Sequence, residues 1–108
     1  MKGGIFRFRP GRDVRGREQQ GPRYCLVVLN PDLSHLSTWL VIPTSTSVRP
    51  ASFRPAITVA GAPTRAMCEQ MRAVDPTQRL GERVGVLGGD EMSAVDEALR
   101  LVLDLDAR

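Results

Sequence analysis

Hydrophobic residues along this chain fall in short runs that are separated by clusters of Gly, Pro, Ser and Thr. Residues 5–9 alternate apolar and basic side chains, which predicts a half-buried strand. Continuous apolar runs over 24–29 and 38–42 predict buried strands, and Pro43 is expected to end the second of them. The further predicted strands are 56–60, 67–74 and 84–87.

Polar segments separate these strands and predict the connections between them. Residues 10–22 are rich in Gly, Pro and Arg, and residues 43–54 are rich in Ser, Thr and Pro. Both predict long loops, which are often functional. Shorter polar stretches at 31–37 and 77–82 each predict a helical turn, and residues 61–63 predict a tight turn.

One amphipathic helix is predicted after the Gly88-Gly89 break. Apolar residues follow at spacings of three and four, which places them on one face of a helix. These residues are Met92, Val95, Leu99 and Val102. Short strands, long loops and this helix together predict a mainly β fold with a C-terminal α-helix, either a small barrel or a twisted sheet.

The chain has 108 residues, so one domain over residues 1–108 is expected. Hydrophobic residues make up 42% and charged residues 25%, as in a globular protein. No apolar run approaches the roughly 18 residues of a membrane span. The sequence has no recognisable signal peptide, so a cytoplasmic location with no membrane partner is expected. Cys25 and Cys68 lack metal-ligand spacing and are expected to be buried free thiols.

Basic residues are concentrated in the first half of the chain. Residues 1–54 carry nine basic and three acidic side chains, and residues 55–108 carry six basic and nine acidic ones. All the basic residues except Lys2 are arginine, which favours bidentate contacts to phosphate and stacking on bases. This distribution indicates either a nucleic-acid-binding face or scattered solvated charges.

Several kinds of catalysis are excluded by the residues that are absent. The only histidine is His35, so no histidine pair exists for acid–base catalysis, and His35 itself is expected on the surface. Phosphate-binding and dinucleotide-binding glycine motifs are missing, and no metal or cofactor site is expected. Arginine, hydroxyl, amide and carboxylate side chains remain. They suit stabilisation of a phosphate during attack by an RNA 2′-OH, which needs no metal in principle.

Two polar clusters border the predicted strands. Arg23 lies at the start of the strand 24–29, and Thr44-Ser45-Thr46-Ser47 follow the strand 38–42. Rigid strands would hold such groups in a site. The alternatives are a local salt bridge for Arg23 and backbone capping by the hydroxyls. Gln70 and Arg72 could equally be the exposed face of an edge strand.

Several segments, in order along the chain, resemble the MazF/PemK family of toxin endoribonucleases. They are K-G-G-I-F (2–6), G-R-E-Q-Q-G-P-R-Y-C-L-V-V (16–28), V-I-P-T-S-T-S (41–47), E-Q-M-R-A-V-D (69–75) with R-L (79–80), and the helix 95–105. The chain departs from the family pattern at three positions. Gly4 replaces an aspartate, Tyr24 replaces a proline, and Ser45 stands where threonine is usual.

The resemblance implies an SH3-like barrel of the PemK/CcdB toxin type that forms a homodimer. It also implies metal-independent cleavage of single-stranded RNA, which leaves 2′,3′-cyclic phosphate and 5′-OH ends. The target could be mRNA, rRNA or tRNA. A cognate MazE-like antitoxin is the implied inhibitory partner.

The family's catalytic arginine maps to Arg23 and its catalytic hydroxyl to Ser45, with Thr46 as the alternative hydroxyl. The loops at 10–22 and 46–54 are expected to read bases. The expected RNA-binding residues are Arg17, Glu18, Gln19, Arg49, Gln70 and Arg72. Two other hypotheses stay open: a non-catalytic CcdB-like toxin that poisons DNA gyrase, and a barrel that binds RNA without cutting it.

Overall fold

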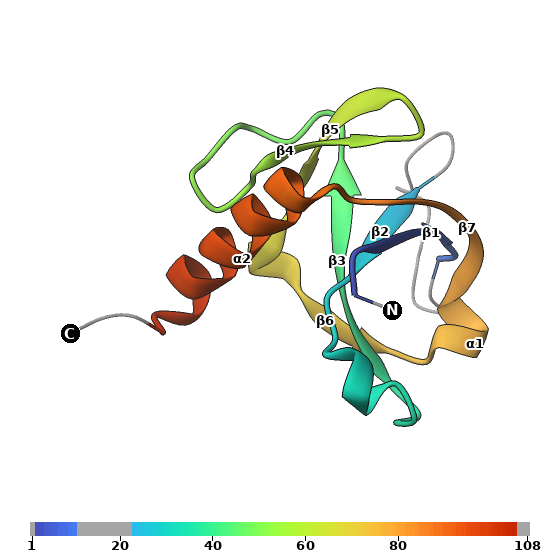
Figure 1. The fold of residues 1–108 in the computed structure, drawn as a ribbon. Coiled ribbons are helices and arrows are strands. Elements are labelled where there is room, and N and C mark those ends of the chain that lie inside the picture. Colours follow the sequence, from blue (N-terminus) through green and yellow to red (C-terminus); the bar gives the residue numbers. More distant parts are fainter. Residues whose placement is uncertain (1, 11–22, 106–108) are drawn as a thin grey trace.

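The computed structural model describes residues 2–10 and 23–105 (Figure 1). Its strands are β1 (Gly4–Phe8), β2 (Tyr24–Val27), β3 (Trp39–Ser45), β4 (Ala56–Val59), β5 (Ala62–Ala66), β6 (Arg72–Val74) and β7 (Leu80–Val86). Its helices are the 3-10 turns η1 (Pro31–Leu33) and η2 (Cys68–Gln70), the single-turn α1 (Pro76–Arg79), and α2 (Gly89–Leu103).

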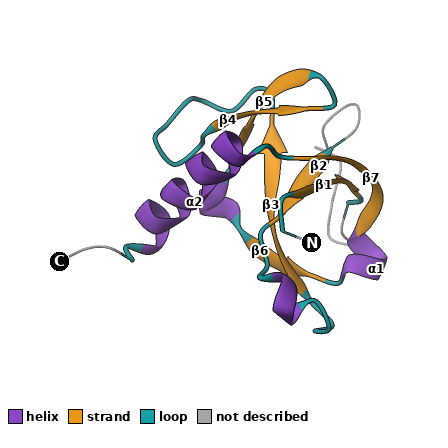
Figure 2. Ribbon diagram, in the orientation of Figure 1, coloured by secondary structure: helices purple, strands orange, loops and turns teal. Residues whose placement is uncertain are grey.

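The strands form one curved antiparallel sheet in the order β4-β5-β3-β2-β1-β7, with β6 paired to β3 beside this path. Figure 2 shows the sheet bending into a half-barrel, with α2 lying across one side of it. The predicted mainly β class with a C-terminal helix is therefore confirmed. The expected helical turns also exist, although α1 begins and ends earlier than predicted and β7 starts four residues earlier.

The prediction that Pro43 ends its strand is wrong. β3 continues through Pro43 to Ser45, and Pro43 lies opposite Cys25 of β2. Proline has no N–H to donate, so a ladder must break on the side that its nitrogen faces. β3 pairs with β6 up to Val41 and with β5 from Thr44 onward. Pro43 thus lies where β3 changes partner, and its carbonyl still accepts a bond from Met67 N at 2.9 Å.

The sequence prediction also missed β5 and made the following strand too long. β4 and β5 form a hairpin in which Ala60 (φ 52°) and Gly61 (φ 80°) connect the pair Val59 and Ala62. Positive φ at both loop residues is typical of a type I′ turn. Of the strand predicted over 67–74, only the part from Arg72 onward is strand, because residues 68–70 form η2.

The sheet separates two hydrophobic clusters because side chains alternate between its faces. Leu26, Ile42 and Val95 belong to the larger cluster, which includes the apolar stripe predicted for α2. Cys25 and Val41 belong to the second cluster, on the opposite face. Cys25 and Cys68 are fully buried free thiols, as expected, and His35 is exposed.

Replacing Leu26 by alanine should lower the free energy of unfolding by about 2–5 kcal/mol, because Leu26 is fully buried beneath α2. Leu36, which is 44% exposed, is the matched control. Leu36→Ala should change the stability by less than about 0.5 kcal/mol. Urea unfolding of both variants measures the difference, and equal losses would contradict this assignment of the core.

Candidate functional site

The ends of β2 and β3 bring together the two principal candidates from the sequence. The β2–β3 register pairs Cys25 with Pro43, and its extension by two positions sets Arg23 across from Ser45. The hydroxyl of Thr44 donates to the Tyr24 carbonyl at 3.1 Å and ties these strand ends together. Arg23 and Ser45 therefore lie opposite each other, where β2 begins and β3 ends.

The spacing of the ladder bonds brings this pair close. Val28 N donates to Leu40 O at 3.1 Å, so Val28 and Leu40 form a hydrogen-bonded pair of the β2–β3 ladder. In an antiparallel ladder, hydrogen-bonded and non-hydrogen-bonded pairs alternate along the strands. By this alternation, Arg23 and Ser45 fall at a non-hydrogen-bonded position. Side chains at such positions approach more closely than at hydrogen-bonded ones.

Arg23 and Ser45 belong to a longer row of opposed residues across the sheet. Phe8 N donates to the Arg23 carbonyl at 2.8 Å, which places Phe8 on the β1 side of Arg23. Ser45 is paired with Arg65 on the β5 side. Alternation along β2 and β3 puts this row on the face of Cys25 and Val41, opposite the cluster beneath α2. The helix therefore lies on the other face of the sheet from this row.

The neighbouring hydroxyl groups have different surroundings. Thr44 is buried, and its hydroxyl is committed to the Tyr24 carbonyl. Ser45 is half-buried at the end of β3, where its Oγ accepts a hydrogen bond from Ser47 N at 3.2 Å. Thr46 is exposed and lies beyond the strand. Ser45 is thus the hydroxyl residue that shares the row with Arg23.

The remaining candidates are spread over several elements. Gln70 is exposed in η2, and Arg72 is exposed in β6, where it pairs with Val41. The expectation that Gln70 and Arg72 share one strand is therefore wrong, because Gln70 belongs to the 3-10 turn that precedes β6. Arg49 is exposed in the loop after β3. The candidates Arg17, Glu18 and Gln19 lie outside the described residues.

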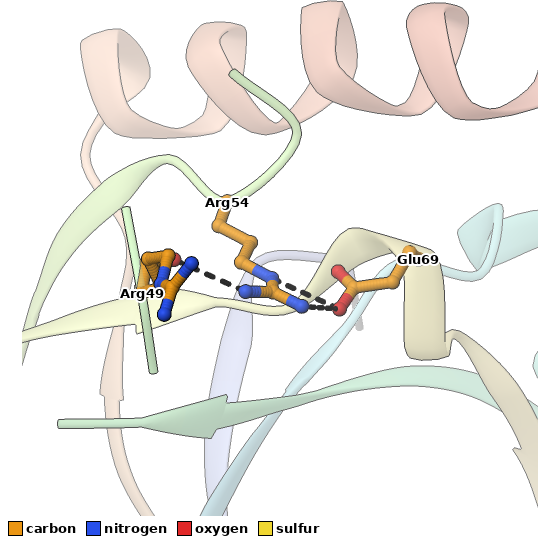
Figure 3. Close-up of polar contacts among 3 residues, drawn as sticks. All are labelled: Arg49, Arg54 and Glu69. Atoms are coloured by element: carbon orange, nitrogen blue, oxygen red, sulfur yellow. Dashed lines mark hydrogen bonds and ion pairs between the residues drawn. The ribbon is translucent and has the colours of Figure 1, made fainter. Parts of the chain in front are cut away.

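An ion pair that the sequence analysis missed joins the loop at 46–55 to η2 (Figure 3). Arg54 donates to one carboxylate oxygen of Glu69 through Nε at 2.9 Å and through Nη2 at 2.6 Å. Its Nη1 donates to the Arg49 carbonyl at 3.1 Å. Arg65 in turn donates to the Arg54 carbonyl at 2.8 Å. This network fixes the loop beside Gln70.

The hydrogen bond from Arg54 is the largest cause of a lowered pKa at Glu69. Glu69 is therefore a carboxylate committed to Arg54 rather than a proton acceptor tuned to neutral pH. The two partners are fifteen positions apart in the sequence, and the segment between them carries no pattern that pairs them. The contact becomes visible only in the folded chain, where the loop at 46–55 lies next to η2.

Among the described residues, no group of three or more His, Cys, Asp or Glu side chains could hold a metal ion. The helices of this part of the chain are all too short or too polar to cross a membrane. The polar side chains of the row carry guanidinium and hydroxyl groups.

Comparison with known proteins defines the class. Residues 2–103 match the PemK-like, MazF-like toxins of type II toxin–antitoxin systems, and this chain belongs to that family. It is 38% identical over 105 residues to the protein of Mycobacterium tuberculosis (strain ATCC 25618 / H37Rv) named putative toxin Rv3098A. That alignment covers 97% of this chain and 98% of the relative.

Solved structures share the fold. An endoribonuclease from a mycobacterial species, in complex with its cognate antitoxin, aligns with a TM-score of 0.80 at 17% identity, covering 100% of this chain and 98% of that chain. The Mycobacterium tuberculosis toxin MazF-mt6 gives 0.75 at 20% identity, with 95% and 98% covered. MazF from Deinococcus radiodurans gives 0.76 at 18% identity, with 95% and 94% covered. The expected barrel of the PemK toxin type is confirmed.

A double-mutant cycle on Arg54→Ala and Glu69→Ala should give a coupling of about 0.5–1 kcal/mol near neutral pH. The pKa of Glu69 in the folded state lies below its ordinary 4.5, so the coupling is fully present above that pH. It should disappear as the pH falls through the folded-state pKa. Urea unfolding of all four proteins between about pH 7 and pH 2.5 measures this, and a coupling that stays constant would contradict the assignment.

Proposed function

We propose that this toxin is a metal-independent endoribonuclease that cleaves single-stranded RNA at the row containing Arg23 and Ser45. The observation that carries the proposal is the β2–β3 register, whose extension sets the two side chains across from each other on the face opposite α2. The toxin family of the chain and its fold, shared with solved endoribonucleases, add support.

The reaction needs few protein groups because RNA supplies its own nucleophile. The 2′-oxygen forms a bond to the adjacent phosphorus as its proton leaves, and the bond from phosphorus to the 5′-oxygen breaks as that oxygen gains a proton. The products are a 2′,3′-cyclic phosphate and a 5′-OH. Negative charge grows on the non-bridging oxygens, so donors held at that place lower the barrier.

Arg23 is the proposed donor to those oxygens. Its side chain is half-buried and has no ion pair with another described residue, so its planar set of N–H groups is available for bidentate contact with a phosphate. Ser45 donates its hydroxyl to a non-bridging oxygen or orients the 2′-OH. Thr44 fixes the distance between the strands by bonding to the Tyr24 carbonyl.

The proposal includes the expected partners. A homodimer and a MazE-like antitoxin are inferred from the family, and a mycobacterial neighbour in fold was solved with its cognate antitoxin. Arg49 and Gln70 are proposed to contact RNA from the loop and from η2, next to the Arg54–Glu69 pair. A cytoplasmic location stays a prediction.

Arg23→Ala should lower the rate of RNA cleavage by about 10²–10³-fold, because one preorganised donor to the developing charge is lost. Ser45→Ala should also lower it, and Thr46→Ala should stay near the wild-type rate because Thr46 lies beyond β3. Cleavage of a long RNA in EDTA, with mapping of 5′-OH ends, gives the rates. Arg100→Ala, an exposed arginine on α2, is the control for loss of positive charge.

Wild-type cleavage by Arg23→Ala would overturn the assigned role of Arg23. Failure of the unmodified toxin to cut several long RNAs would overturn the endoribonuclease proposal itself. If the toxin instead stabilised complexes of DNA with gyrase, that result would favour the CcdB-like alternative.

A further inference from the structure

On the face of the sheet opposite α2, two guanidinium groups lie near one aromatic ring. The Cζ atom of Arg79 is 4.6 Å from the centroid of the Phe8 ring, and that of Arg72 is 5.9 Å from it. The three residues come from α1, β6 and β1, so only the folded chain brings them together. Phe8 packs against the second hydrophobic cluster, which holds the ring in place.

Backbone contacts hold Arg79 in position. Its Nε donates to the Arg9 carbonyl at 2.8 Å, and Arg9 N donates to the Arg79 carbonyl at 2.8 Å. Arg9 also donates through Nη1 to the Leu80 carbonyl at 3.0 Å. Only the Nε of Arg79 is used by these contacts, so its terminal N–H groups stay available to a ligand.

The positive charge at this place is not neutralised within the described part of the chain. No ion pair there involves Arg72 or Arg79. Both charges act on the buried Cys25 thiol, where they oppose the burial that raises its pKa to about 12. Two like charges near one ring repel each other, and an anion that bridges them would remove this repulsion.

This pair of arginines lies next to the proposed catalytic row. Phe8 is bonded to Arg23 across β1 and β2, and neighbouring strands lie about 5 Å apart. An RNA strand with its scissile phosphate at Arg23 would therefore present a neighbouring phosphate to Arg72 and Arg79. The ring of Phe8 would keep both guanidinium groups in place as the RNA binds.

We propose that Arg72 and Arg79, braced by Phe8, form a second phosphate subsite for single-stranded RNA beside Arg23. The subsite rests on the proposed function of the row, but it concerns binding rather than the bond that breaks. Arg72 was a candidate from the sequence alone, whereas Phe8 and Arg79 are assigned by their contacts. Phe8 is a positioning residue, since it acts through the two arginines.

The test measures binding of a fluorescent single-stranded RNA with a 2′-O-methyl group at every nucleotide, which cannot be cleaved by 2′-OH attack. Fluorescence anisotropy over a series of salt concentrations gives the slope of log K against log [salt]. Arg72→Gln and Arg79→Gln should each weaken binding about tenfold and reduce the slope by about 0.7, the value for one lost phosphate contact on a single strand. Arg100→Gln on α2 should change neither quantity.

Two further variants distinguish the positioning effect of the Phe8 ring from the effect of the arginine charge. Phe8→Leu keeps an apolar side chain in the cluster but removes the ring, and it should weaken binding with both arginines present. Arg79→Lys keeps the charge but loses the planar guanidinium, so it should weaken binding with less change in slope than Arg79→Gln. Thermal unfolding of each variant confirms that the protein compared is folded.

Unchanged slopes for Arg72→Gln and Arg79→Gln would overturn the subsite, as would an equal change for Arg100→Gln. Wild-type binding by a folded Phe8→Leu protein would overturn the bracing role. These outcomes do not depend on catalysis. A toxin that binds this RNA through the subsite but never cuts natural RNA would refute the endonuclease proposal and leave the subsite standing.

Discussion

Strand β3 pairs with three other strands, and the change of partner along it occurs at Pro43. Because proline cannot donate a backbone hydrogen bond, the ladder with β6 cannot run on through this position. The chain between β5 and β6 turns as η2 at this gap, and β5 takes over the edge of β3 beyond it. Ser45 thereby stays in the sheet, between β5, which contains Arg65, and β2, which Arg23 immediately precedes.

Because side chains alternate along each strand, the two faces of the sheet carry different residues and have different roles. α2 covers the larger cluster with its apolar stripe, so the face with Cys25 and Val41 is left for polar residues at its margins. The arginines Arg54 and Arg23 have different surroundings. Arg54 is neutralised by Glu69 and fixes a loop, whereas Arg23 has no carboxylate partner in the described ranges. The face is thus suited to an anion that the protein itself does not supply.

Some of this arrangement was predictable and some was not, for identifiable reasons. The stripe from Met92 to Val102 has a helical period that local sequence reveals, and it does pack on the core. β5 was missed because Pro63 is typical of a turn, although in the hairpin it pairs with Thr58. The strand over 67–74 was predicted too long because an apolar residue can be buried in a 3-10 turn as well as in a strand. Cys68 is such a residue, since it is buried in η2.

The amino-acid sequence by itself determined the class of the fold, the family resemblance and the two candidates Arg23 and Ser45. Periodicity and short motifs are local properties of the sequence, so they can be recognised before the fold is known. Only the tertiary structure decided that Arg54 pairs with Glu69 and that Arg72 and Arg79 both lie near the Phe8 ring. Such contacts join residues from separate elements. They depend on strand register and on how the sheet bends, which no local pattern encodes.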